Sequence, residues 1–264
     1  MGAVHARLDQ LAHEHGLSGA TVEQLDSFVR TLAHDPTAPT TVTDPVLAVD
    51  AHIADSLDAL AVEAVRQAIR IADIGAGAGV PGLVLAAALP GASVSLVESV
   101  GKKCDFMRRA AETAGLTNAG IVNLRVEDWT GGIGTHDLVT ARALAPLGVL
   151  IEYAAPLLEV GGSLVAWKGQ VDAGELNDAV AAAAATGMQG AEVRHQPERT
   201  GARSHYLHVY KKVRATPERF PRRAGMARKR PITALFACFG IERTPPTDLH
   251  RQYIAGRWPT AISS

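Results

Sequence analysis

The most informative part of the sequence is Ile71-Ala72-Asp73-Ile74-Gly75-Ala76-Gly77-Ala78-Gly79-Val80-Pro81-Gly82. An apolar run carries an acidic residue, turns through glycines and reaches Pro81, which suits the first turn of a helix because no N–H is needed there. Glycines permit a positive φ and let the backbone approach a ligand closely. At the carboxyl end of a strand, such a turn is typical of the nucleotide cradle of an open α/β sheet.

The glycines alone do not decide which nucleotide binds. Gly77, Gly79 and Gly82 satisfy the pattern G-x-G-x-x-G, so NAD stays open. Asp73 favours S-adenosylmethionine, because a carboxylate there would attract the ammonium group of that cofactor and repel a pyrophosphate. Glu98, at the end of the next predicted strand, is placed to accept hydrogen bonds from the ribose of either cofactor. The two acids together predict an S-adenosylmethionine site.

The pattern of apolar residues changes near Ile69. Before it, apolar residues recur at helical spacing, with a break at 35–39 and a third helix predicted after Asp44-Pro45. After it, strands and helices alternate, which predicts a doubly wound, mostly parallel, seven-stranded α/β sheet. Strands are predicted at 69–74, 93–98, 119–124, 136–141 and 162–167, with 189–196 and 203–212 as an antiparallel edge pair. Helices are predicted at 81–89, 101–115, 146–158 and 172–186.

These boundaries divide the chain of 264 residues into four predicted parts. They are an N-terminal helical cap at 1–68, a cofactor-binding domain at 69–212, a basic C-terminal arm at 213–232 and an atypical tail at 233–264. The tail either docks as a short helix or is disordered, and the sequence assigns it no function.

Composition predicts a soluble cytoplasmic protein. Hydrophobic residues make up 47% of the chain and charged residues 20%, which is ordinary for a globular domain. No signal-peptide pattern and no long apolar run occur, so no membrane partner is expected. Cys104 and Cys238 form neither a C-x-x-C pair nor a zinc-binding spacing, which predicts no metal and a reducing compartment.

The net charge is −1, but one segment is strongly basic. Its cations are Lys211, Lys212, Arg214, Arg219, Arg222, Arg223, Arg228, Lys229 and Arg230. Glu218 is its single acid, and Phe220 and prolines interrupt it. Arginine offers a planar fork to phosphate and a face for base stacking, so the segment predicts nucleic-acid binding. The alternatives are a solvated face, or a structural wrap whose arginines pair with the acidic remainder of the chain.

Five motifs give the chain a specific resemblance. They are Asp44-Pro45 followed by His52-Ile53-Ala54-Asp55-Ser56-Leu57; Glu98-Ser99 with Lys102-Lys103; Ala141-Arg142-Ala143-Leu144-Ala145; Leu164-Val165-Ala166-Trp167-Lys168-Gly169; and Phe220-Pro221-Arg222-Arg223-Ala224-Gly225-Met226 through Lys229-Arg230-Pro231-Ile232. In this order they resemble the bacterial 16S rRNA guanine-N7 methyltransferases, historically called glucose-inhibited division protein B. The resemblance covers residues 8–232. The chain departs from the family pattern at Ala38, Pro39, Ala51 and Ala141, which bears on RNA recognition more than on the cradle.

The resemblance implies N7-methylation of a guanine, at position 527 of 16S rRNA, with the small ribosomal subunit or its precursor as partner. It implies that Gly75 approaches the methionine part of S-adenosylmethionine, that Val126 and Glu127 contact adenine, and that Arg142 contacts the cofactor. The full set of expected cofactor contacts is Asp73, Gly75, Gly77, Val80, Glu98, Val126, Glu127 and Arg142. The expected substrate contacts are His52, Lys168, Arg222, Arg223, Lys229 and Arg230.

The implied chemistry needs no catalytic acid or base. Guanine N7 has an in-plane lone pair and no proton, so catalysis would rest on alignment of the reactants. An NAD-dependent reductase is the competing enzyme class, but its Tyr-x-x-x-Lys proton donor is missing, since Tyr153 is followed by Leu157. A non-enzymatic RNA-binding protein is the third possibility, and the intact Asp73, Glu98 and Arg142 argue against it.

Overall fold

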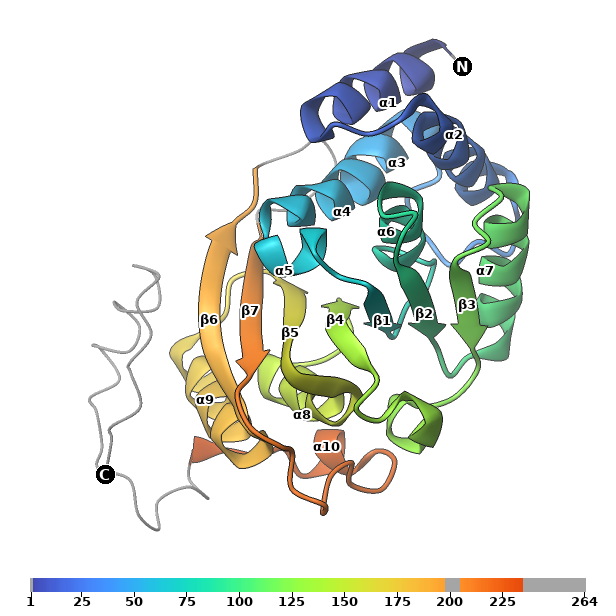
Figure 1. The fold of residues 1–264 in the computed structure, drawn as a ribbon. Coiled ribbons are helices and arrows are strands. Elements are labelled where there is room, and N and C mark those ends of the chain that lie inside the picture. The colour runs from blue at the N-terminus through green and yellow to red at the C-terminus, as the bar shows by residue number, and fades with distance from the viewer. Residues whose placement is uncertain (1, 198–204, 235–264) are drawn as a thin grey trace.

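The computed structural model describes residues 2–197 and 205–234, in which seven strands form one sheet of order β3-β2-β1-β4-β5-β7-β6 (Figure 1). The strands are β1 Arg70–Ile74, β2 Ser93–Val97, β3 Ala119–Val122, β4 His136–Arg142, β5 Leu158–Lys168, β6 Met188–His195 and β7 Tyr206–Lys212. The first five strands run parallel, and β7 pairs antiparallel with both β5 and β6. The predicted doubly wound sheet with an antiparallel edge pair is confirmed.

Helices cover both faces of this sheet (Figure 1). They are α1 Gly2–His15, α2 Gly19–His34, α3 Pro45–Ala48, α4 Asp55–Leu57, α5 Glu63–Arg66, α6 Gly82–Ala88, α7 Gly101–Thr113, α8 Leu147–Leu157, α9 Ala173–Thr186 and α10 Met226–Lys229. Successive strand residues point to opposite faces. Ile71 and Leu138 therefore join the core shared with α1, α2, α6 and α7, whereas Ala72 and Val139 join the core under α8 and α9.

The third predicted helix is broken into short pieces. Asp44 caps α3 as expected, since its carboxylate accepts from the Val46 and Leu47 N–H groups at 2.8 and 3.0 Å. A π-helical turn at Val49–Ala54 follows, then α4, a 3₁₀ turn at Asp58–Ala61 and α5. No proline or glycine lies between 46 and 61 to signal the break. The wide turn reflects tertiary contacts, which are described with the site.

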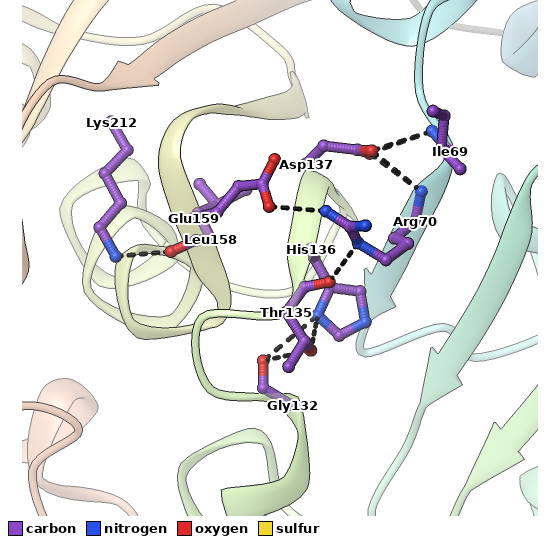
Figure 2. A network of polar contacts seen from close by, with 9 residues as sticks. All are labelled: Ile69, Arg70, Gly132, Thr135, His136, Asp137, Leu158, Glu159 and Lys212. Atoms are coloured by element: carbon purple, nitrogen blue, oxygen red, sulfur yellow. Dashed lines mark hydrogen bonds and ion pairs between the residues drawn. The ribbon is translucent and has the colours of Figure 1, made fainter.

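The amino-terminal edge of the sheet is held by a polar network (Figure 2). The Asp137 carboxylate accepts from the backbone N–H groups of Ile69 and Arg70, and the Arg70 guanidinium forms an ion pair with Glu159 at 2.6 Å. At the end of β7, the buried Lys212 ammonium donates to the Leu158 carbonyl at 2.6 Å. Burial lowers the pKa of Lys212. These polar groups have partners within the protein at the amino-terminal edge of the sheet. The opposite, carboxyl edge therefore remains for a ligand.

Three of the sequence predictions concern the tail, membrane-spanning helices and metal ions. The tail beyond Ala234, including Cys238, lies outside them. Within residues 2–197 and 205–234, no helix is long and apolar enough to cross a bilayer. The same residues contain no group of three or more His, Cys, Asp or Glu side chains arranged to hold a metal ion.

Candidate functional site

The glycine turn lies where β1 ends, against the end of β2. The Gly75 N–H donates to the Val97 carbonyl at 2.8 Å, and the Gly77 N–H donates to the Glu98 carboxylate at 3.3 Å. Gly75, Gly77 and Gly79 have φ of +67°, +57° and +85°, which other residues rarely adopt. The sequence at these three positions therefore fixes the shape of the turn.

Asp73 lies beneath this turn. It is 1% exposed, and its Oδ2 accepts from the Gly82 N–H while its Oδ1 accepts from the Thr140 hydroxyl, both at 2.9 Å. A Cβ at position 82 would approach Oδ2 to 2.7 Å, so only glycine permits this contact. Asp73 thus makes a supporting contact to the first residue of α6, and its expected contact with an ammonium group stays a prediction.

We expect Asp73→Asn to change how stability depends on pH. Burial raises the pKa of Asp73 to about 7 from 3.8, against the opposing effects of Thr140, Gly82 and Arg142. The folded protein therefore holds a proton that the unfolded chain releases, so the wild type loses stability as pH rises from about 4 to about 7. Asparagine has no such proton and can bond both neighbours.

Urea unfolding of both proteins across this range measures the difference. The variant should gain up to about 4 kcal/mol relative to the wild type between pH 4 and pH 7. The buried histidines are common to both proteins and cancel in the comparison. A constant difference at all pH values would show that Asp73 is ionised in the folded protein.

Glu98 follows β2 and faces the turn. Its Oε1 accepts from the Val100 N–H at 2.9 Å, and its Oε2 lies 3.7 Å from the Lys103 ammonium. The residue is 7% exposed. The structure therefore brings Glu98 together with the glycine turn at one edge, and a carboxylate in this place can accept hydrogen bonds from hydroxyl groups.

Val80, Val126 and Glu127 lie near the same edge with different environments. Val80 packs partly buried against the core on the α6 side, and Val126 against the core on the α8 side. Val126 and Glu127 belong to a 3₁₀ turn that follows β3. The Glu127 side chain, however, binds the C-terminal arm: its Oε1 accepts from the Gly225 N–H at 2.8 Å. The expected contact of Glu127 with adenine stays a prediction.

Arg142 ends β4 and binds the N-terminal helices. Its NH1 forms an ion pair with Asp55 Oδ2 at 2.8 Å, and its NH2 donates to the Ala51 carbonyl at 2.9 Å. The side chain remains 25% exposed. Ala51 lies in the π-helical turn, so the wide turn and Arg142 belong to one arrangement. The prediction that Arg142 lies at this edge is confirmed, whereas the contacts of Arg142 with Asp55 and Ala51 were not predicted from the sequence.

His52 and Lys168, expected to face a substrate, both have partners within the protein. His52 Nε2 lies 3.1 Å from the Thr40 hydroxyl, and burial, with the charge of Arg142, lowers the pKa of His52 to about 4. The ring is therefore neutral at pH 7. The Lys168 ammonium forms an ion pair with Glu175 at 2.7 Å. Lys168 fastens the start of α9 to the end of β5, and His52 connects the π-helical turn to the loop at Thr40.

The basic arm divides into anchored and exposed cations. Arg222 binds the buried Glu152 of α8 through two contacts of 2.5 Å. Arg223, Lys229 and Arg230 are exposed. The structural-wrap alternative is therefore correct for Arg222, whereas the other three cations that the sequence selected face solvent.

Leu144 and Arg228 also lie at this edge, and the sequence did not predict a role for either in the site. A Cβ at Gly75 would lie 2.5 Å from Leu144 Cδ1, so Leu144 covers the glycine turn. The Arg228 guanidinium donates to the Leu144 carbonyl at 2.8 Å, and both residues line a pocket of about 460 Å³ between the starts of α8 and α9. The position of Leu144 directly after Arg142-Ala143 was the available signal; Ala143, at φ +52°, turns the chain there.

Comparisons with known proteins agree on one family. The family model described as rRNA small subunit methyltransferase G matches residues 22–204. The Ribosomal RNA small subunit methyltransferase G of Rubrobacter xylanophilus is 44% identical over 187 residues, which cover 69% of this chain and 72% of the relative. The protein of the same name from Symbiobacterium thermophilum is 40% identical over 204 residues, covering 73% and 82%.

Solved structures of other proteins are similar to part of this chain. The structure described as "Crystal Structure of antibiotic-resistance methyltransferase Kmr" superposes with a TM-score of 0.47 at 20% identity and covers 59% of this chain and 92% of that chain. A second, described as "Conversion of a Disulfide Bond into a Thioacetal Group during Echinomycin Biosynthesis", gives a TM-score of 0.49 at 17% identity and covers 62% and 83%.

Proposed function

The chain belongs to the rRNA small subunit methyltransferase G family, and we propose that it transfers a methyl group from S-adenosylmethionine to N7 of a guanine in 16S rRNA. The observation that carries the proposal is the left-handed glycine turn at the end of β1, facing Glu98 at the end of β2. Ligands of open α/β sheets bind at this carboxyl edge. We place the reaction in the cytoplasm, on the small ribosomal subunit or its precursor.

The residues at the edge fit this cofactor. A Cβ added at Gly77 would have only the Gly75 carbonyl oxygen within 4 Å, at 3.8 Å. The glycine turn therefore leaves room for a ligand to approach the backbone of Gly77. The Glu98 carboxylate would hold ribose hydroxyls. Asp73 supports the turn from below, so it does not by itself distinguish S-adenosylmethionine from NAD. Family membership supports the first.

The chain's contribution to the chemistry is positioning. Bound S-adenosylmethionine supplies an electrophilic methyl group. Because guanine N7 carries a free lone pair and no proton, no side chain needs to remove or donate a proton. The glycine turn and the loop at Leu144 would hold cofactor and base in line, and such alignment contributes roughly 7–11 kcal/mol in favourable cases.

The exposed cations of the arm support an RNA substrate. The arm contacts the 126–128 turn through Gly225 and the loop after β4 through Arg228. Its exposed residues Arg223, Lys229 and Arg230 are therefore carried on a segment fastened to the same edge as the glycine turn. Phosphate contacts of this kind give RNA affinity without base specificity.

Methyl transfer to defined RNA tests the proposal. The full chain is incubated with S-adenosylmethionine and small subunits from cells that lack this methyltransferase, and the nucleosides are examined by mass spectrometry. We expect 7-methylguanosine in 16S rRNA and calorimetric binding of S-adenosylmethionine but not of NAD. Methylation at another atom, or tight NAD binding without S-adenosylmethionine binding, contradicts the proposal.

A further inference from the structure

Asp55 is a buried acid that joins three parts of the fold. Its side chain is 2% exposed, and its two oxygens meet two cationic or ionisable groups. Oδ2 lies 2.8 Å from Arg142 NH1, and Oδ1 lies 2.5 Å from His205 Nε2. Its backbone carbonyl accepts from the Trp167 indole at 3.3 Å. Asp55 is therefore fixed by β5 and by the segment before β7 while it holds the end of β4.

The π-helical turn supplies a second contact to the same arginine. The Ala51 carbonyl, in the turn Val49–Ala54, accepts from Arg142 NH2 at 2.9 Å. Wide helical turns of this kind are rare and occur frequently at functional sites. Asp55 and Ala51 thus contact one terminal nitrogen each and define the plane of the Arg142 guanidinium, and the Arg142 side chain remains 25% exposed.

This plane lies beside the glycine turn. In the β1–β4 register, Asp73 is opposite Thr140 and Ile74 is opposite Ala141, so Arg142 comes next to the first glycine. The charge of Arg142 lowers the pKa of both Asp73 and His52. The Arg142 guanidinium is therefore close enough to Asp73, beneath the glycine turn, to interact with it electrostatically.

We propose that Asp55 is a positioning residue, which orients Arg142 toward the methionine carboxylate of S-adenosylmethionine and neutralises its charge. The inference rests on the proposed function. An arginine fork matches a carboxylate well. An uncompensated cation would, however, repel the sulfonium group of the same cofactor. The Asp55 carboxylate removes this repulsion while Ala51 keeps the fork in place.

A double-mutant cycle separates positioning from folding. Asp55→Asn, Arg142→Met and the double variant are compared with the wild type by calorimetric S-adenosylmethionine affinity and by urea unfolding. Asp26→Asn is the matched control, because Asp26 is also a buried acid of the N-terminal helices and forms an ion pair with Arg30 at 2.5 Å, on α2.

We expect Asp55→Asn to weaken S-adenosylmethionine binding by about tenfold or more in the wild type, as for loss of a charge-assisted contact, and not at all in the Arg142→Met background. Asp26→Asn should leave affinity unchanged. An equal loss in both backgrounds, or normal affinity of Asp55→Asn, overturns the positioning role alone. Failure of the wild type to bind S-adenosylmethionine overturns the proposed function with it.

A second variant decides the matter if Asp55→Asn does not fold. Arg142→Lys keeps the charge, but one ammonium group cannot occupy the two nitrogen positions that face Asp55 and Ala51. We expect it to bind S-adenosylmethionine about tenfold more weakly than the wild type. Wild-type affinity in a folded Arg142→Lys protein overturns the proposal.

Discussion

Arg222→Met is expected to lower the free energy of unfolding by about 3–5 kcal/mol, because it leaves a buried carboxylate without its partner. Glu152 lies in the middle of α8 and is 2% exposed. Both of its oxygens contact the Arg222 guanidinium at 2.5 Å. Urea unfolding at pH 7 measures the loss. The double variant Glu152→Leu/Arg222→Met should recover most of it, since an apolar pair leaves no buried charge.

The matched control uses the exposed cations of the same arm. Replacing Arg223, Lys229 and Arg230 together with alanine should leave the free energy of unfolding nearly unchanged, because these side chains face solvent. If each contacts phosphate, the salt dependence of RNA binding should become shallower by about two units on a log–log scale. Large destabilisation by the triple variant, with none from Arg222→Met, would reverse the assignment of anchor and RNA contact.

The elements of the sheet domain follow from local signals. The pattern around Asp172 places α9 correctly, because the Asp172 carboxylate caps the helix at the Glu175 N–H and Gly187 ends it with φ of +84°. The edge pair of β6 Met188–His195 and β7 Tyr206–Lys212 agrees with the predicted segments 189–196 and 203–212. Periodicity and capping act over a few residues, so a single sequence contains them.

The contacts of the site depend on groups far apart in the chain. Asp73 accepts from Thr140, and Arg142 binds Asp55 and Ala51, and none of these pairs is marked by spacing. The sequence therefore placed Asp73 and Arg142 at the carboxyl edge, but it did not indicate that Asp73 is buried beneath the turn. Likewise, Arg222 and Arg223 are neighbours of the same type. Only the position of Glu152 on α8 separates the anchored one from the exposed one.

Gly75→Val is expected to abolish S-adenosylmethionine binding, with a loss of about hundredfold or more. Gly75 has φ of +67°, a conformation that costs other residues about 1–3 kcal/mol and β-branched ones the most. A Cβ there would also lie 2.5 Å from Leu144 Cδ1 and 2.9 Å from Cδ2. The turn or the loop after β4 must therefore move, and both lie at the edge where we propose that S-adenosylmethionine binds. Calorimetry with S-adenosylmethionine measures the loss.

Gly91→Val is the matched control for this change. Gly91 has nothing within 4 Å of an added Cβ and no positive φ, so both the fold and the affinity should be retained. The variant Gly75→Val/Leu144→Ala removes the steric contact but keeps the strained φ, and we expect it to regain only part of the affinity. Full recovery would assign the effect to Leu144 alone. Normal binding by Gly75→Val itself would show that the ligand does not rest on this turn.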